Sequence, residues 1–143
     1  MNSKTTISDV RPAGMNAFGE EHQVVAVTGG NGSYRRTPCA KCPWRKDAVG
    51  EFPADAFRHS ASTAYDMSEK TFGCHESGHV KPAICAGFLL RGADHNKKVR
   101  MMLIEQGGLV VNENGHELHE NYRDMAIANG VDREDPVLKP CRD

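Results

Sequence analysis

The chain has 143 residues, a formal net charge of −1 and a hydrophobic fraction of 38%, with 14 glycines. This length suits one domain with a modest core, and the small net charge argues against a non-specific grip on nucleic acid or on an acidic membrane. No apolar run approaches the roughly 20 residues that span a bilayer, and the first residues lack the apolar stretch of a secretory signal. We therefore expect a cytoplasmic protein.

The two ends of the chain differ from its middle. Residues 1–21 show no sustained apolar period and are predicted to form a flexible or loosely docked arm. The β-branched run at 23–28 predicts a strand that ends in a glycine-rich turn, which fits no phosphate-binding motif. A single metal-binding domain is predicted over 22–131, followed by a polar tail over 132–143.

Apolar residues recur at helical spacing in several segments of this domain. Four helices are predicted from these patterns: 54–63, 83–91, 96–106 and 116–129. Short apolar runs at 71–74 and 109–111 favour two further strands. The expected fold class is α+β: a small metal-stapled domain with a cysteine knuckle, a few short strands and three to four helices.

Four of the five cysteines have the spacing of a metal site. In a reducing compartment, a C-x2-C pair with further cysteines indicates metal or redox chemistry rather than disulfides. Cys39 and Cys42 form such a pair, and a knuckle of this kind lets two thiolates converge on one ion. Cys74 ends a predicted strand, and Cys85 lies in the first turns of a predicted helix, whose positive end favours a thiolate. These four are the predicted ligands, although Cys85 could instead be a small buried hydrophobic residue.

Histidines offer alternatives to this ligand set. His75 follows Cys74 directly, so it is predicted either to donate a hydrogen bond to a ligand sulfur or to replace Cys74 as the ligand. His116 and His119 could form a second metal site, but an H-x2-H pair is a weak signal and a solvated helix start is the favoured interpretation. Cys141 lies in the polar tail and is expected to be a free, exposed thiol.

Four cysteines can hold either zinc or an iron–sulfur cluster. Pro43 after Cys42 resembles the cysteine-proline step of bacterial ferredoxins, which favours a [4Fe–4S] cluster. The cluster pattern there is compact, whereas this one is spread along the chain. Zn²⁺ is therefore the expected metal and a [4Fe–4S] cluster the alternative.

The motifs around the cysteines carry a resemblance to a known family. The chain reads P-C-A-K-C-P-W-R at 38–45, E-F-P at 51–53, C-H at 74–75 and C-A-G at 85–87. This series resembles a small uncharacterised family of bacteriophages and some bacteria, over about residues 37–131. The resemblance implies a phage or prophage origin and a shared metal site, but no reaction.

Basic and aromatic residues are concentrated around the knuckle. A segregated cationic patch with aromatics is typical of a single-stranded nucleic-acid groove, and Trp and Arg are common anchors of protein interfaces. The predicted partner-binding residues are Trp44, Arg45, Lys46, Arg35 and Arg36. The alternative is that Trp44 packs over the metal loop and that the cations are solvated.

These observations predict a metal-stabilised, zinc-containing phage or prophage accessory protein that binds a host protein or nucleic acid. No base–nucleophile pair is evident, and four cysteines would close the metal site, so no catalytic residue is predicted. The alternative is a small metalloenzyme or [4Fe–4S] protein acting on nucleic acid or a nucleotide. That alternative gains weight if His75 or water completes the site.

Overall fold

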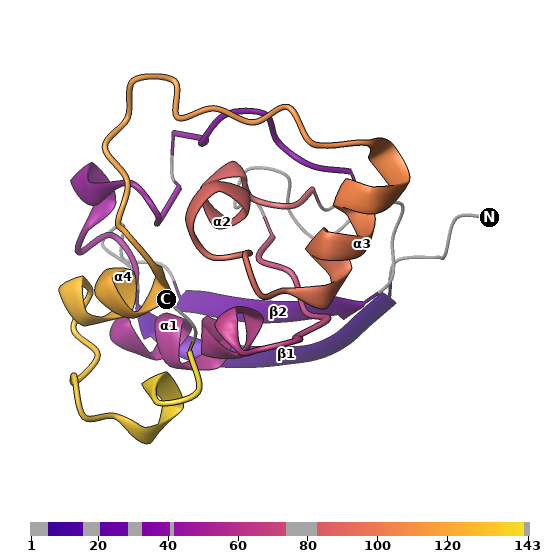
Figure 1. Cartoon of the computed structure of the whole chain (residues 1–143). Coiled ribbons are helices and arrows are strands. Elements are labelled where there is room, and N and C mark those ends of the chain that lie inside the picture. The colour runs from indigo at the N-terminus through magenta and orange to yellow at the C-terminus, as the bar shows by residue number, and fades with distance from the viewer. Residues whose placement is uncertain (1–5, 16–20, 29–32, 41, 74–82, 142–143) are drawn as a thin grey trace.

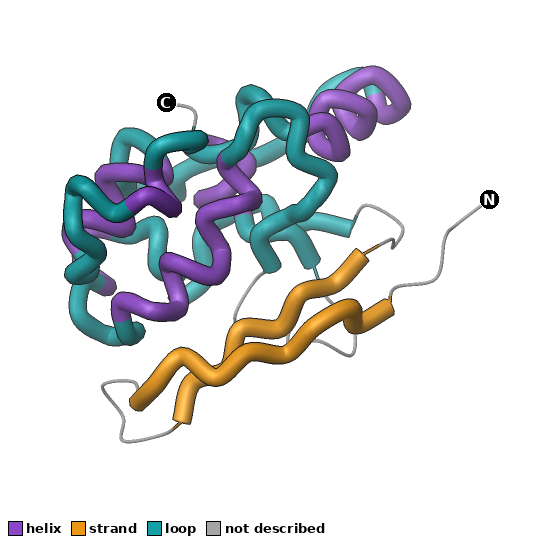
Figure 2. Tube along the Cα trace, turned by 90° about the horizontal axis from the view of Figure 1, so that it is seen from below, coloured by secondary structure: helices purple, strands orange, loops and turns teal. Residues whose placement is uncertain are grey.

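The computed structural model describes residues 6–15, 21–28, 33–40, 42–73 and 83–141. The chain begins with an antiparallel hairpin of β1 (Thr6–Met15) and β2 (Glu21–Thr28). A layer of short helices and loops follows, and Figure 1 and Figure 2 show the hairpin lying along one side of it, with α1 in contact with both strands. The α-helices are α1 (Ala54–Ser60), α2 (Ala86–Arg91), α3 (Lys97–Gln106) and α4 (Tyr122–Ala128). Short 3₁₀ helices lie at Lys46–Ala48, Ala61–Ala64 and Pro136–Leu138.

The N-terminal hairpin agrees only partly with the sequence. β2 covers the strand predicted at 23–28, but β1 lies within residues 1–21, where the sequence predicts no strand. The pairing is irregular between Pro12 and Met15. Proline cannot donate to a ladder and is tolerated at edges and irregularities of a sheet, so Pro12 does not prevent β1 from forming. Because proline and glycine are both depleted in strands, Pro12 and Gly14 prevent the prediction of this strand from the sequence.

Three helices begin and end close to the predicted positions. Asn96 caps α3 by accepting a hydrogen bond from the Val99 amide at 3.0 Å, and Gly107 ends the helix with φ of 68°. The Asn96 amide also donates to the Lys70 carbonyl at 2.7 Å, which explains why this polar side chain is buried. Within the described ranges, no helix has the length and apolarity that crossing a membrane requires.

The last helix is much shorter than predicted. α4 begins after Asn121, whose side chain accepts from the Asp124 amide at 2.8 Å, and not at residue 116. The residues before it pair instead with the cysteine loop, which contains Cys39 and Cys42 and continues to Lys46. Lys46 N donates to the carbonyl of Glu117 at 2.9 Å, and His119 N donates to the carbonyl of Trp44 at 3.0 Å. These backbone groups serve the loop and are not available to a helix.

The predicted α+β domain with several short strands is wrong. Residues 33–141, where described, are helical with long loops, and the strands of the described chain are confined to the N-terminal hairpin. The run at 71–74 yields a single bridge between Gly73 and Ile84, and the run at 109–111 yields no strand. Beside that bridge, the Phe72 carbonyl accepts from the Cys85 amide, and the Val110 amide donates to the Tyr34 hydroxyl instead of to a neighbouring strand.

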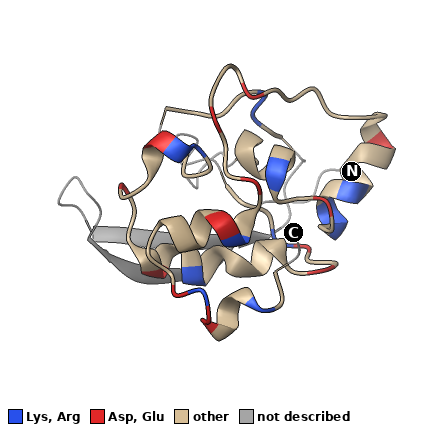
Figure 3. Ribbon diagram, turned by 60° about the vertical axis from the view of Figure 1, so that its left-hand side comes forward, with Lys and Arg blue, Asp and Glu red and all other residues tan. Residues whose placement is uncertain are grey.

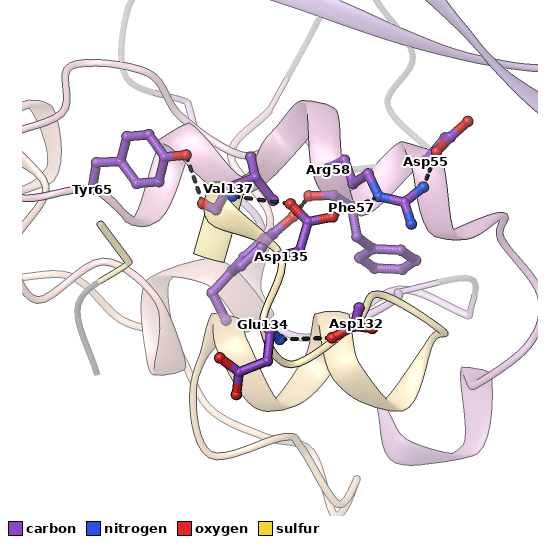
Figure 4. A network of polar contacts seen from close by, with 9 residues as sticks. Asp55, Phe57, Arg58, Tyr65, Asp132, Glu134, Asp135 and Val137 are labelled. Carbon is purple, nitrogen blue, oxygen red and sulfur yellow. Dashed lines mark hydrogen bonds and ion pairs between the residues drawn. The ribbon is translucent and has the colours of Figure 1, made fainter. Parts of the chain in front are cut away.

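The C-terminal segment, predicted as a polar tail, binds α1 and the turn after it (Figure 4). Arg58 pairs with Asp55 and with Asp135, the latter at 3.0 Å, and the Tyr65 hydroxyl donates to the Val137 carbonyl at 2.7 Å. The Val137 amide and the Arg58 guanidinium hold the pKa of Asp135 below its usual value. These contacts dock the segment against the domain.

An aromatic cluster forms the centre of the core. Trp44 is fully buried and meets Phe72, Phe88 and Tyr122 with ring centroids 5.8, 6.4 and 5.8 Å away. The edge and tilted arrangements suit aromatic quadrupoles. The cluster joins the cysteine loop, the segment before Cys74, α2 and α4. The aromatic core therefore lies directly beside the candidate metal site.

Candidate metal centre

The knuckle around Cys39 and Cys42 is a turn held by its own backbone. Cys42 N donates to the Cys39 carbonyl at 3.1 Å, and Arg45 N donates to the Cys42 carbonyl at 3.1 Å. The Arg45 guanidinium donates to the carbonyls of Cys39 and Ala40 at 3.3 Å each. Two further bonds, of 2.8 and 2.5 Å, attach it to Asp47. Arg45 therefore braces the loop from outside.

Cys85 meets this knuckle from the start of α2. It is the N-cap residue of that helix, and its sulfur lies 3.5 Å from the sulfur of Cys42. Both thiols are buried, as is Cys39. A disulfide would need about 2.05 Å, whereas two thiolates bound tetrahedrally to one zinc ion at about 2.3 Å lie about 3.8 Å apart. The observed separation is close to the second arrangement.

The contact with Cys42 and burial both disfavour ionisation of the Cys85 thiol. The hydrogen bond with Cys42 and the loss of solvent raise the pKa of the Cys85 thiol well above its ordinary value. The backbone amides of Phe88 and Gly87, at the start of α2, act in the opposite direction. A positive charge at the sulfurs would oppose the first two effects and favour the Cys85 thiolate.

Cys74 and His75 lie outside the described residues. The chain just before them does reach Cys85: the Phe72 carbonyl accepts from the Cys85 amide at 2.8 Å, and Gly73 bridges to Ile84. Within the described part of the chain, no group of three or more His, Cys, Asp or Glu side chains converges as a metal site. The structure thus brings Cys42 and Cys85 together, and the full ligand set stays a prediction.

The C-A-G segment fits against the knuckle because residue 87 is glycine. A Cβ atom at Gly87 would lie 2.5 Å from the Cβ of Trp44 and 3.1 Å from the Cys42 sulfur. Gly92, at the end of α2, would place a Cβ 2.4 Å from Cη2 at the far end of the Trp44 ring. Both glycines therefore allow α2 to lie directly on the tryptophan of the cysteine loop.

A model of a family of unknown function, DUF6283, matches residues 34–142. The chain belongs to this family. No match was found among curated proteins or among solved structures. The DUF6283 match begins at Tyr34, after the hairpin, and extends beyond residue 131, so it includes the C-terminal segment that binds α1. The predicted membership of an uncharacterised family is confirmed at this level.

The prediction that Trp44 is an exposed partner-binding residue is wrong. Trp44 is fully buried in the core, as in the alternative interpretation, because a loop braced on both sides turns its largest apolar side chain inward. Arg45 pairs with Asp47, and Lys46 pairs with Glu117 at 3.1 Å. Exposed cations remain around the knuckle, but they are partly neutralised and have no exposed tryptophan between them.

Two further residues that were predicted to be exposed are buried. Cys141 is buried, with its sulfur 3.7 Å from the Ala61 carbonyl, and is not exposed in a tail. His119 is buried as well, and burial, followed by the nearby Lys46 charge, lowers its pKa. Its Nε2 has no hydrogen-bond partner among the described residues. His116 and His119 do not share a helix face, because α4 begins after both.

Proposed function

We propose that this DUF6283 protein is a zinc-stabilised binding protein of phage or prophage origin that acts in the host cytoplasm. One structural zinc ion would be held by Cys39, Cys42, Cys74 and Cys85. The observation that carries the proposal is the 3.5 Å approach of the buried Cys42 and Cys85 sulfurs. A reducing cytoplasm keeps such thiols available to a metal.

The donor chemistry fits zinc. Two buried neutral thiols in contact gain little from each other, whereas a divalent ion would bind both as thiolates and compensate their negative charges. Cys39 supplies a third sulfur on the same turn, and Gly73 brings the chain to Cys85 one residue before Cys74. Four thiolates would fill a tetrahedral ion and leave no open position, so the role is structural rather than catalytic.

The short sulfur–sulfur distance also favours a single ion over a cluster. In a [4Fe–4S] cluster each cysteine binds a different iron, so two ligand sulfurs stand farther apart than two ligands of one ion. The approach of Cys42 to Cys85 suits two ligands of the same metal. We therefore propose Zn²⁺ in preference to the cluster.

Metal analysis of the purified full-length chain tests this. We expect about one zinc per chain, no stoichiometric iron or sulfide, and no visible absorption. The preparation should be made both with and without oxygen, because a cluster can be lost in air. A brown protein with stoichiometric iron and sulfide would contradict zinc while keeping the cysteine ligands.

We propose a protein partner in preference to nucleic acid. Stacking on bases requires exposed aromatic rings, but Trp44 is buried and Tyr34 is half-buried, with its hydroxyl accepting from the Val110 amide at 3.2 Å. The ion pairs of Arg45 and Lys46 further reduce the charge available to phosphates. The exposed cations would then serve contacts to an acidic surface of a host protein.

Oligonucleotide binding separates these two partners. Anisotropy titrations with a labelled single strand should show no saturable binding below about 100 µM at either about 50 or about 200 mM salt. Arg36→Glu is the matched variant, because Arg36 is exposed and the change reverses a charge near the knuckle. Saturable binding that falls steeply with salt and disappears in this variant would establish nucleic acid as the partner.

A further inference from the structure

A zinc ion held by four cysteines would leave an excess of negative charge beside the core. Each thiolate carries one negative charge and Zn²⁺ carries two positive charges, so the proposed centre has a net charge of about −2. Cys39, Cys42 and Cys85 are all buried. Buried charge is costly unless cations or hydrogen-bond donors compensate it. The proposed site therefore requires a compensating group close to its sulfurs.

The overall charge of the protein does not supply this compensation. The whole chain has a formal net charge of −1, and Figure 3 shows Lys and Arg interspersed with Asp and Glu along the described chain. Charges of both signs that are mixed in this way largely cancel at a distance, because salt and water screen them. The compensation must therefore come from an individual cation that contacts the knuckle.

Arg45 is such a cation. Its Nη1 atom lies 3.3 Å from the Cys39 carbonyl oxygen and 3.3 Å from that of Ala40, so the guanidinium rests on the turn that carries the knuckle cysteines. The hydrogen bond with Asp47 contributes most to raising the pKa of Arg45, and the charges of Cys42 and Cys39 raise it further. The electrostatic effect of the guanidinium therefore reaches both cysteines of the knuckle.

Asp47 fixes the direction of this guanidinium without cancelling its charge at the sulfurs. Its carboxylate accepts from Arg45 Nε at 2.8 Å and from Nη2 at 2.5 Å, which is a bidentate geometry. The side chain of Asp47 is 63% exposed, whereas that of Arg45 is 16% exposed. Solvent therefore screens the carboxylate more strongly than the guanidinium. The net effect of the pair at the knuckle is that of a cation.

We propose that Arg45 is a positioning residue of the metal centre, whose charge compensates the thiolates while its hydrogen bonds hold the Cys39 turn. This inference rests on the proposed zinc site, and it assigns Arg45 to the metal rather than to the predicted partner-binding surface. Loss of a group that supports metal ligands from outside typically weakens metal binding by about 10- to 100-fold. Arg45→Gln should therefore bind zinc at least about tenfold more weakly than wild type.

Competition with a chromophoric zinc chelator measures this affinity on the reduced, full-length chain. Arg45→Gln keeps an N–H donor but removes the charge, whereas Arg45→Lys keeps the charge but lacks the planar fork of donors. The affinity of Arg45→Lys should therefore fall between the other two and closer to wild type. Arg91→Gln is the matched control, because Arg91 is also half-buried but pairs with Glu113 at 2.6 Å, and it should keep wild-type affinity. Circular dichroism verifies that each zinc-loaded variant is folded.

These variants separate charge compensation from bracing alone. An equal loss of affinity in Arg45→Lys and Arg45→Gln would show that only the fork of hydrogen bonds matters, and would overturn the proposal. Wild-type affinity in Arg45→Gln, or an equal loss in Arg91→Gln, would overturn it as well, and all three results would leave the zinc site intact. A wild type that binds no zinc would instead refute the proposed function, and this inference with it.

Discussion

Cys42→Ser is expected to abolish both metal binding and cooperative folding. Structural zinc sites contribute on the order of 10 kcal/mol of apparent binding free energy, which matches the whole stability of an ordinary domain, about 5–15 kcal/mol. Cys42 is fully buried against Cys85 and against the Trp44 wall of the core, so loss of the ion would leave unpaired polar atoms in the centre of the molecule. Zinc content and thermal unfolding followed by circular dichroism measure the two effects.

The matched control is Cys141→Ser. Cys141 is also buried, and its sulfur already contacts the Ala61 carbonyl, which a serine hydroxyl can also use. This variant should retain one zinc and should unfold cooperatively. Chelation of wild-type zinc should reproduce the Cys42→Ser behaviour, which separates loss of the metal from a simple packing defect. Stoichiometric zinc in Cys42→Ser, or none in Cys141→Ser, would refute the ligand assignment.

Variants of Cys74 and His75 test which of the two residues is the fourth ligand. Cys74→Ser should behave like Cys42→Ser, and His75→Ala should keep the metal. The reverse result would place His75 on the metal and Cys74 beside it. Neither residue belongs to the described part of the chain, so this comparison rests on the position of Gly73 beside Ile84.

The sequence predicts best what local chemistry determines. The bounds expected for α3 are nearly the true ones, because Asn96 and Gly107 are a cap and a stop whose effects act within one turn. Cys85 lies beside Cys42, two of the four expected ligands, while the metal and the full ligand set stay predictions. For α3 the signal lies in a few neighbouring residues, whereas the Cys42–Cys85 contact joins residues 43 positions apart.

The failures come from tertiary contacts that no local period reveals. Trp44 lies in a loop, and a loop has no repeat that distinguishes its inner side from its outer side, so a buried tryptophan resembles an exposed anchor in the sequence. The segment before α4 has helical periodicity, yet its backbone pairs with the cysteine loop through Glu117 and His119. Cys141 falls in a segment that reads as a solvated tail, because the contacts of that segment are made with α1 and the turn after it.

Gly87→Ala is expected to destabilise the protein by about 2–4 kcal/mol. In an ordinary helix the same change stabilises by about 1 kcal/mol, so the sign is diagnostic. The new methyl group would lie 2.5 Å from the Trp44 Cβ, which is an unyielding atom, and 3.1 Å from the Cys42 sulfur. The zinc should also be released more readily on chelation. Gly73→Ala is the control, because a methyl group there would meet no atom within 4 Å beyond its chain neighbours.

Gly92→Ala provides a sharper comparison, because its Cβ would meet the far end of the same ring, 2.4 Å from Cη2 of Trp44. Trp44→Phe removes that atom but keeps the Cβ. In a double-mutant cycle measured by urea unfolding, Trp44→Phe should therefore reduce the cost of Gly92→Ala by about 1 kcal/mol or more, and should leave the cost of Gly87→Ala unchanged. Equal relief at both glycines would show that the ring, and not the backbone of the cysteine loop, limits how closely α2 approaches. Relief at Gly92 alone would establish that a glycine at 87 is what allows α2, and with it Cys85, to contact the knuckle. The atom that residue 87 faces is the Cβ of residue 44, which every amino acid except glycine has.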